Sequence, residues 1–488
     1  MANVKQETIN GAKWALINKC VVQPVSFVYS MILARLIAPS EMGVLALTSI
    51  FFTLAYALKE AGLGQALIRK QDRTDLDCST VFWFNIAANL LIGLLFWLCA
   101  PWFAAFFNVP DLKWITRISS IMMVLSATQS VHHTLFTARR DFKTTTIISI
   151  VTTLSGMPVT LYLAYTGWSY WSLVFSGVFT GILSLIIIWV VSPWKPSFVF
   201  SIKSFKEFFS FGYKLSLANC VYAIYDELIH FIIGKLYSPA QLALYNRAYH
   251  LGTLPASMLF VPLQGIMFPI LATIQDDDER MTRVYRQYIR LCTMPMLWIL
   301  ITLAVNANSI VRLFYGPTWE ACTPYLQLLC IGFIFSPMIR VNHSYLMVKG
   351  RSDLLLKRET NVRIVGLILM ISAAFHSVMA ICCAFALFSI YNLFITLRYT
   401  IKISSLTYRE QMRDLLPYLC TAILANIPSF LIWLLGAPFY VCAFAGPGIS
   451  LILYITVQHL RKDDAYTMLR DTAWNSAPMR KIRARFSA

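Results

Sequence analysis

Uninterrupted runs of apolar residues constrain the fold of this 488-residue chain more than any other feature. Residues 78–104 and 171–191, for example, contain no Asp, Glu, Lys or Arg. A helix of about 20 apolar residues crosses the hydrocarbon core of a bilayer. Backbone groups must be paired there, and these runs lack the period-two alternation of barrel strands. The sequence therefore predicts an all-α, polytopic membrane protein.

Fourteen runs of this kind are expected to span the membrane. They cover residues 11–37, 42–68, 78–104, 115–137, 145–165, 171–191, 211–236, 244–274, 288–307, 323–347, 362–375, 380–397, 417–435 and 441–460. The loops between them are too short to fold into a catalytic domain. The chain also lacks nucleotide-binding, zinc and nucleophile motifs. We therefore expect a protein that is not an enzyme and that uses no metal or cofactor.

The distribution of Lys and Arg predicts the orientation of these spans. With the N-terminus inside, the first ten residues, the cytoplasmic loops and the tail hold 28 of the 41 Lys and Arg residues. The external loops hold two, Lys113 and Arg312. Basic loops remain on the cytoplasmic side, so both termini are expected there. The net charge of +18 then faces anionic lipid head groups, and a nucleic-acid partner is not expected.

One stretch of the sequence occurs twice. Residues 31–46 read MILARLIAPSEMGVLA, and residues 231–246 read FIIGKLYSPAQLALYN, so that Pro39 corresponds to Pro239. Each copy joins a span that runs from inside to outside to the span that follows it. The repeat is therefore parallel and predicts two six-helix lobes related by an axis along the membrane normal.

The expected organisation has five parts. These are an N-lobe of six spans at 1–191, a cytoplasmic linker at 192–210, a C-lobe of six spans at 211–400, two extra spans within 401–460 and a basic cytoplasmic tail at 461–488. Repeated helical bundles are typical of secondary transporters, which bind their substrate between the repeats. Rocking of one lobe against the other then gives alternating access. The span at 244–274 contains three prolines and is the expected bending element.

Several segments together resemble the polysaccharide-transporter branch of the multidrug/oligosaccharidyl-lipid/polysaccharide exporter superfamily, in its O-antigen and colanic-acid exporter type. They are LARLIAPSEMG (33–43), EAGLGQALIRK (60–70), STVFWFN (79–85), IGKLYSPAQLALYNRAYHL (233–251), FPILATIQDD (268–277) and FYGPTWEACTPYLQLL (314–329). The resemblance implies the fold of MATE and MurJ exporters, with fourteen helices. It also implies flipping of undecaprenyl-pyrophosphate-linked oligosaccharide across the bacterial inner membrane. A polysaccharide polymerase and a chain-length regulator are the implied protein partners.

Charged residues inside the expected spans are the candidate transport residues, because such charges usually face a cavity or a partner. The cations Lys19, Arg35, Arg247 and Arg340 are expected to bind the pyrophosphate and acidic sugars. The acids Glu60, Asp226 and Glu227 are expected to bind a coupling proton or sodium ion. His230, three residues after Glu227, lies on the same helical face.

Simpler interpretations remain open for these residues. The opposite charges can pair and hold helices together, and Arg35 can extend to the membrane surface. Two other exporters of the same superfamily are alternatives, one for drugs and one for lipid II. A membrane oligosaccharide polymerase is the alternative from a different class, but such an enzyme generally needs a long external loop.

Overall fold

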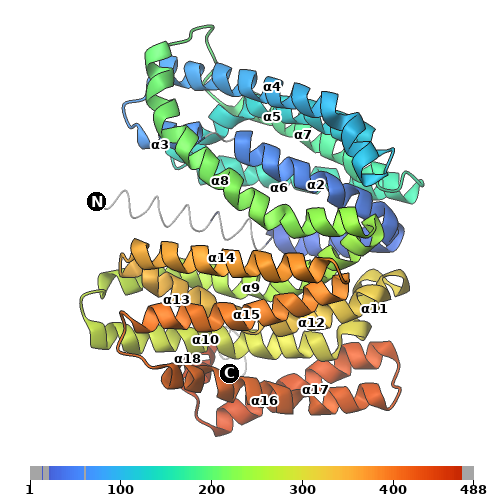
Figure 1. Ribbon diagram of the computed structural model, residues 1–488, viewed down its shortest axis with the longest axis vertical. Coiled ribbons are helices and arrows are strands. Elements are labelled where there is room, and N and C mark those ends of the chain that lie inside the picture. Colours follow the sequence, from blue (N-terminus) through green and yellow to red (C-terminus); the bar gives the residue numbers. More distant parts are fainter. Residues whose placement is uncertain (1–13, 15–20, 60–61, 475–488) are drawn as a thin grey trace, which may run out of the picture. The chain divides into compact units, whose positions relative to one another are not determined.

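Helices are the only regular secondary structure among residue 14, residues 21–59 and residues 62–474, which are the residues that the computed structural model describes (Figure 1). Nine helices in this part of the chain are long and apolar enough to cross a membrane. This confirms the predicted all-α membrane fold. Other predicted spans coincide with described helices outside that set, so the number fourteen stays a prediction.

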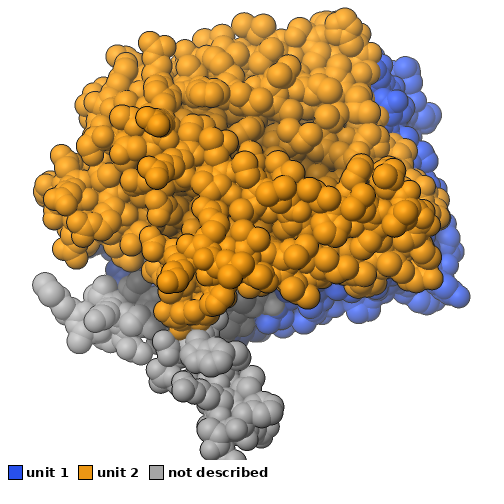
Figure 2. Space-filling model, turned by 90° about the horizontal axis from the view of Figure 1, so that it is seen from below, with its two compact units in different colours: residues 1–243 blue, residues 244–488 orange. Residues whose placement is uncertain are grey.

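The chain divides into two compact units, residues 1–243 and residues 244–488 (Figure 2). In the first unit, α4 packs along α5, α6 along α7, and α2 along α8 (Figure 1). The described helices of this unit are Val21–Leu36, α2 (Pro39–Lys59), α3 (Leu63–Arg69), α4 (Asp75–Phe107), α5 (Leu112–Ala138), α6 (Phe142–Tyr165), α7 (Trp171–Val191) and α8 (Ile202–Leu236).

The second unit contains the remaining helices, and its first helix begins just before the division. In it α10 packs along α16, α14 along α15, and α16 along α17. The helices are α9 (Pro239–Thr273), α10 (Asp278–Val305), α11 (Ala307–Tyr315), η1 (Pro317–Cys322), α12 (Thr323–Phe333), α13 (Ser336–Val348), α14 (Ser352–Ala374), α15 (Val378–Ile401), α16 (Tyr408–Leu434), α17 (Phe439–Leu460) and α18 (Asp464–Trp474).

The division between the units falls after the predicted linker and not within it. Helix α8, the expected first span of the C-lobe, packs against α2, α3 and α4 and therefore belongs to the first unit. The predicted lobe boundaries describe the repeat in the sequence, whereas the units describe which helices are in contact. The lobe boundaries stay a prediction.

The repeated stretch forms the same corner in both copies. A helix ends at Leu36 and α2 begins at Pro39, while α8 ends at Leu236 and α9 begins at Pro239. A proline is favoured in the first turn of a helix, where its missing N–H needs no partner. The two corners also touch, because a Cβ atom on Gly43 would lie only 1.9 Å from the carbonyl oxygen of Pro239. Only glycine fits this approach of two backbones.

Two predicted spans are interrupted in the structure. The span at 42–68 contains α2 and α3, and Gly62 before α3 has a φ of 63°, a conformation that glycine adopts without strain. The span at 323–347 contains α12 and α13, and α13 begins with Pro337 in its first turn. A proline inside a longer helix would lack a hydrogen bond and clash with the preceding turn. The three prolines of the predicted span at 244–274, by contrast, lie within one uninterrupted helix, α9.

Candidate functional site

A cavity of about 700 Å³ lies between α2, α5 and α7 of the first unit. Most of its wall is apolar, and the polar side chains that line it are Thr48, Thr53, Ser119, Ser126 and Gln129. Its volume falls in the range of about 300–1,000 Å³ that is usual for small-ligand sites. No charged side chain lines this cavity among the residues that the structure describes.

A carboxylate adjoins this cavity through one of its lining residues. The hydroxyl of Thr53 on α2 donates to Oε1 of Glu227 on α8, at 2.8 Å. Nδ1 of His230 lies 3.1 Å from the other carboxylate oxygen, as the three-residue spacing on one helix predicts. The side chains of Glu227 and His230 are 18% and 24% exposed, respectively. The carboxylate is thus partly shielded from solvent and bonded to two groups that carry no fixed charge.

The hydroxyl of Thr53 can form a hydrogen bond with Glu227 whether that carboxyl group is ionised or protonated. Its hydroxyl oxygen is 2.8 Å from Glu227 and 2.9 Å from the carbonyl oxygen of Ser49, one turn earlier on α2. A hydroxyl has one hydrogen to donate and two lone pairs to accept with. It can therefore donate to ionised Glu227, or donate to Ser49 and accept a hydrogen bond from protonated Glu227. Arginine or lysine in the same place could serve only the ionised state.

A second cavity, of about 580 Å³, lies between the helix Val21–Leu36, α6 and α7. Hydroxyl groups line it, and they belong to Ser26, Tyr29, Ser30, Thr152, Thr153, Ser176 and Thr180. Gly177 and Gly181 of α7 line both cavities. A Cβ atom on Gly177 would meet no atom within 4 Å, so this glycine borders open space and does not seat a neighbouring helix.

The corner after α8 packs against the C-terminal end of α4. Nζ of Lys235 donates to the carbonyl oxygen of Phe106 at 2.5 Å and lies 3.9 Å from the centre of the Phe106 ring. Phe231 stacks on the same ring at 5.6 Å. Lys235 therefore lies at the C-terminal end of α4 and anchors the corner, and both Lys235 and its counterpart Arg35 are exposed.

The other predicted cations of the described chain lie against aromatic rings. The guanidinium of Arg247 on α9 is half-buried and lies 5.3 Å from the ring of Tyr315 and 5.4 Å from that of Trp319. Arg340 on α13 is exposed and lies 5.5 Å from the ring of Phe260. These contacts give each cation a packing role beside any role with substrate.

The remaining predicted acids and one predicted cation have different outcomes. Asp226 is exposed, whereas its neighbour Glu227 points toward Thr53. Adjacent residues on a helix face different directions, and it is Glu227 that contacts Thr53, a residue that lines the 700 Å³ cavity. Lys19 and Glu60 lie outside the described residues. Their expected roles stay predictions.

Two charge clusters of the second unit were not predicted. Asp414 on α16 is fully buried and contacts both Arg286 and Arg290 of α10. Their sequence separation is more than a hundred residues, and no local pattern indicates such a pair. Arg290 thus binds a carboxylate on a distant helix.

The second cluster joins α13, α14 and α15. Arg358, which is 5% exposed, donates to Thr396 at 3.1 Å and to Asn392 at 2.6 Å, and it forms an ion pair with Glu359. His343 lies 3.5 Å from the same glutamate. The sequence placed Arg358 in a loop, because the start of the span was set at the next apolar run.

The fold and these sites define the class as a polytopic helical membrane protein with cavities among its helices. A family model described as "Polysaccharide biosynthesis protein" matches residues 32–324, which is more than half of the chain. The chain therefore belongs to this family of polysaccharide biosynthesis proteins, as the resemblance in its sequence predicts.

Named relatives agree with this assignment. The teichuronic acid biosynthesis protein TuaB of Bacillus subtilis is 26% identical over 88% of this chain and 89% of its own. The succinoglycan biosynthesis transport protein ExoT of Rhizobium meliloti is 23% identical over 68% of this chain and 67% of its own. The inward closed structure of the lipid II flippase MurJ matches 92% of this chain and 99% of its own, with a TM-score of 0.69 and 14% identity. This likeness confirms the predicted MurJ-type fold.

Proposed function

We propose that the protein is a flippase that moves undecaprenyl-pyrophosphate-linked oligosaccharide repeat units across the bacterial inner membrane. These units would serve O-antigen, capsule or exopolysaccharide synthesis. Membership of the polysaccharide biosynthesis family supports the pathway, and the relative ExoT carries a transport name. The MurJ-like fold supports alternating access as the mechanism. The termini lie in the cytoplasm, and a polymerase and a chain-length regulator receive the product.

One observation carries the transport mechanism in this proposal: Glu227 is bonded to Thr53, and Thr53 lines the 700 Å³ cavity. A carboxylate whose partners are a hydroxyl and an imidazole, neither with a fixed charge, can take up and release a proton without leaving a partner unsatisfied. A sodium site needs a shell of oxygen ligands, and the bonds of Glu227 to one hydroxyl and one imidazole do not supply one. We therefore choose the proton over sodium as the coupling ion.

The two cavities of the first unit suit the uncharged part of the substrate. The 580 Å³ cavity offers hydroxyl donors and acceptors that match sugar hydroxyls. The 700 Å³ cavity offers an apolar wall beside them. The pyrophosphate requires cations, for which Arg35, Arg247, Arg340 and Lys19 remain the candidates. Glu60 remains a second candidate for proton coupling.

Deletion of the gene, followed by analysis of lipid-linked sugars, tests the proposed function. We expect repeat units to accumulate on the cytoplasmic face, where an added membrane-impermeant glycosidase or label does not reach them from outside. Continued export of repeat units that are not polymerised would instead indicate a polymerase. Drug sensitivity without accumulation would indicate a multidrug exporter. Accumulated lipid II would indicate a peptidoglycan flippase.

A further inference from the structure

Three arginines lie along one face of α10 near its start. Arg283, Arg286 and Arg290 are separated by three and four residues, the spacing that places side chains on one side of a helix. They line a cavity of about 340 Å³ in the second unit together with Glu279, Thr282, Gln287, Ser405 and Asp464. The loops before α10 and before α16, and the tail, are all expected on the cytoplasmic side. They meet at this cavity.

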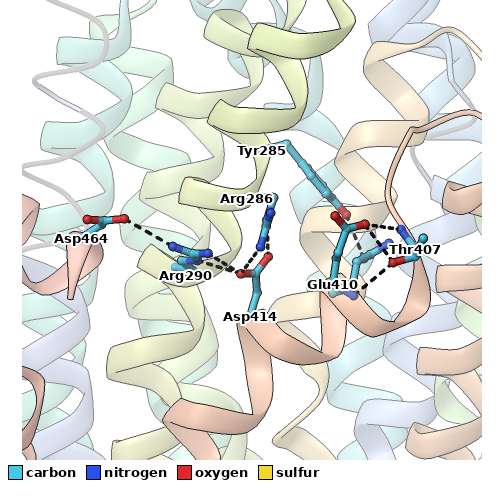
Figure 3. Close-up of polar contacts among 8 residues, drawn as sticks. Tyr285, Arg286, Arg290, Thr407, Glu410, Asp414 and Asp464 are labelled. Atoms are coloured by element: carbon cyan, nitrogen blue, oxygen red, sulfur yellow. Dashed lines mark hydrogen bonds and ion pairs between the residues drawn. The ribbon is translucent and has the colours of Figure 1, made fainter. Parts of the chain in front are cut away.

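Two of these arginines share one buried carboxylate, as Figure 3 shows. Nε and Nη2 of Arg286 donate to the two oxygens of Asp414 at 2.8 and 3.0 Å. Nε and Nη2 of Arg290 lie 2.8 and 2.7 Å from Oδ1 of the same residue. The Asp414 side chain is 0% exposed, whereas those of the arginines are 28% and 29% exposed. One negative charge thus holds two positive charges in fixed orientations.

The outer edges of both guanidinium groups remain for another anion. Asp414 engages Nε and Nη2 of each arginine and leaves the Nη1 donors. Asp464, in the first turn of α18, approaches Nη1 of Arg290 at 3.5 Å, a long ion pair (Figure 3). The Asp464 side chain is 78% exposed, and an exposed pair of this kind contributes little stability. A better anion can replace it.

We propose that this cavity binds a phosphate group, and that the phosphodiester of an anionic phospholipid in the cytoplasmic leaflet supplies it. Planar guanidinium groups match the oxygens of a phosphate, and here Asp414 already holds two of them in place. The hydroxyls of Thr282 and Ser405, 3.4 Å apart, add donors at the same wall. The phosphate takes the place of the Asp464 carboxylate at Arg290. This inference does not depend on the proposed flippase function.

Helix α18 stays docked when Asp464 is displaced. Its N-terminus is held by Asp463, which accepts hydrogen bonds from the backbone N–H groups of Ala465 and Tyr466 and from the hydroxyl of Tyr418. Ala465 is buried in the adjoining core. The ion pair of Asp464 is therefore separable from the fold, and this makes it a useful position for a test.

Two variants change the site in opposite directions without touching Asp414. Arg283→Gln removes a cation of the cavity that forms an exposed ion pair with Glu279. Asp464→Asn removes the carboxylate that competes with phosphate. Arg312→Gln is the matched control, because Arg312 is a half-exposed arginine in an ion pair with Glu320, away from this cavity. The three variants and the wild type are reconstituted in phosphatidylcholine nanodiscs.

The measurement is the rise in thermal unfolding midpoint on adding phosphatidylglycerol to the nanodiscs or, separately, inorganic phosphate to the buffer. We expect the apparent affinity for phosphatidylglycerol to fall about fivefold in Arg283→Gln and to rise in Asp464→Asn. The Arg312→Gln control should match the wild type. If the variants differ in this way with inorganic phosphate but not with phosphatidylglycerol, the cavity would still be a phosphate site, but phospholipid would not be its ligand. An equal response of all four proteins, or none, would overturn the site itself.

Discussion

Two shielded carboxylates of this chain, Asp414 and Glu227, differ in the side chains that they contact. Asp414 is fully buried and receives four N–H contacts from two arginines. Glu227 is 18% exposed and contacts a threonine hydroxyl and an imidazole. Arginine keeps its positive charge under all ordinary conditions, and the two ion pairs of Asp414 tie α10 to α16. Glu227 has partners that accept both of its protonation states, and it adjoins a cavity.

The contacts of Asp414 support a role in holding the fold, whereas those of Glu227 support the proposed role in transport. A carboxylate that is saturated by arginines cannot exchange a proton without leaving two charges uncompensated. A carboxylate bonded to hydroxyl and imidazole groups can exchange a proton at a smaller cost. Substitutions of the two acids should therefore separate stability from transport, and the following predictions test that separation.

The largest expected effect on stability follows from Asp414→Asn. Removing the charge leaves Arg286 and Arg290 without their shared partner, and breaking a buried ion pair typically costs about 3 kcal/mol or more. Thermal unfolding of the purified protein in nanodiscs should show a large drop in midpoint. Asp278→Asn is the control, because that carboxylate is 77% exposed and its pair with Lys349 contributes little. Equal midpoints for the two variants would contradict the structural role of Asp414.

Glu227→Gln should have the opposite effects, with stability kept and export impaired. Glutamine keeps the shape and one acceptor for Thr53, so the unfolding midpoint should stay near that of the wild type. Export of repeat units in cells should fall about tenfold or more, a factor within the usual range of coupling energies. The neighbouring Asp226→Asn, at an exposed position, is the comparison and should retain export. If Asp226→Asn loses export and Glu227→Gln does not, Asp226 and not Glu227 would be the acid that works in transport.

Thr53→Val tests whether the hydroxyl beside Glu227 matters. Valine has the same shape but neither donates to the carboxylate nor accepts from it. We expect the export rate to fall about fivefold, the factor that corresponds to one hydrogen bond of about 1 kcal/mol. Thr53→Ser restores the hydroxyl and should restore the rate. A serine variant as slow as the valine variant would show that packing, and not the hydrogen bond, accounts for the loss.

Arg286→Lys should give the smallest effect. Lysine preserves the positive charge opposite Asp414 but replaces a two-point contact with one, while Arg290 still compensates the carboxylate. We expect a loss of about 1 kcal/mol, measured as a small fall in unfolding midpoint. Export should be unchanged. A fall as large as that of Asp414→Asn would mean that Arg290 contributes nothing to the pair.

Local patterns in the sequence predicted the features of the molecule that depend on neighbouring residues. Apolar runs located the helices, and the repeated proline located the corners at Pro39 and Pro239. The three-residue spacing predicted the contact of Glu227 with His230, which the structure confirms at 3.1 Å. Each of these features lies within a few residues of the chain, where helix geometry determines distance.

Features that join distant segments could not be predicted in this way. Asp414 lies just before the predicted span at 417–435, and only helix packing brings it to Arg286. Thr53 gains significance only because α2 lies beside α8. Helix α18 was expected to be part of a basic tail. It packs against α10, and Asp463 before it accepts a hydrogen bond from Tyr418 of α16, far away in the sequence.

Proton coupling through Glu227 is the central claim, and flipping of labelled lipid-linked oligosaccharide in sealed vesicles tests it most directly. The rate is measured for wild type and Glu227→Gln under a pH gradient, a sodium gradient and no gradient. We predict that the wild type responds to the pH gradient and not to sodium, and that Glu227→Gln flips at one slow rate in all three conditions. A Glu227→Gln variant that still accelerates under the pH gradient would contradict the account.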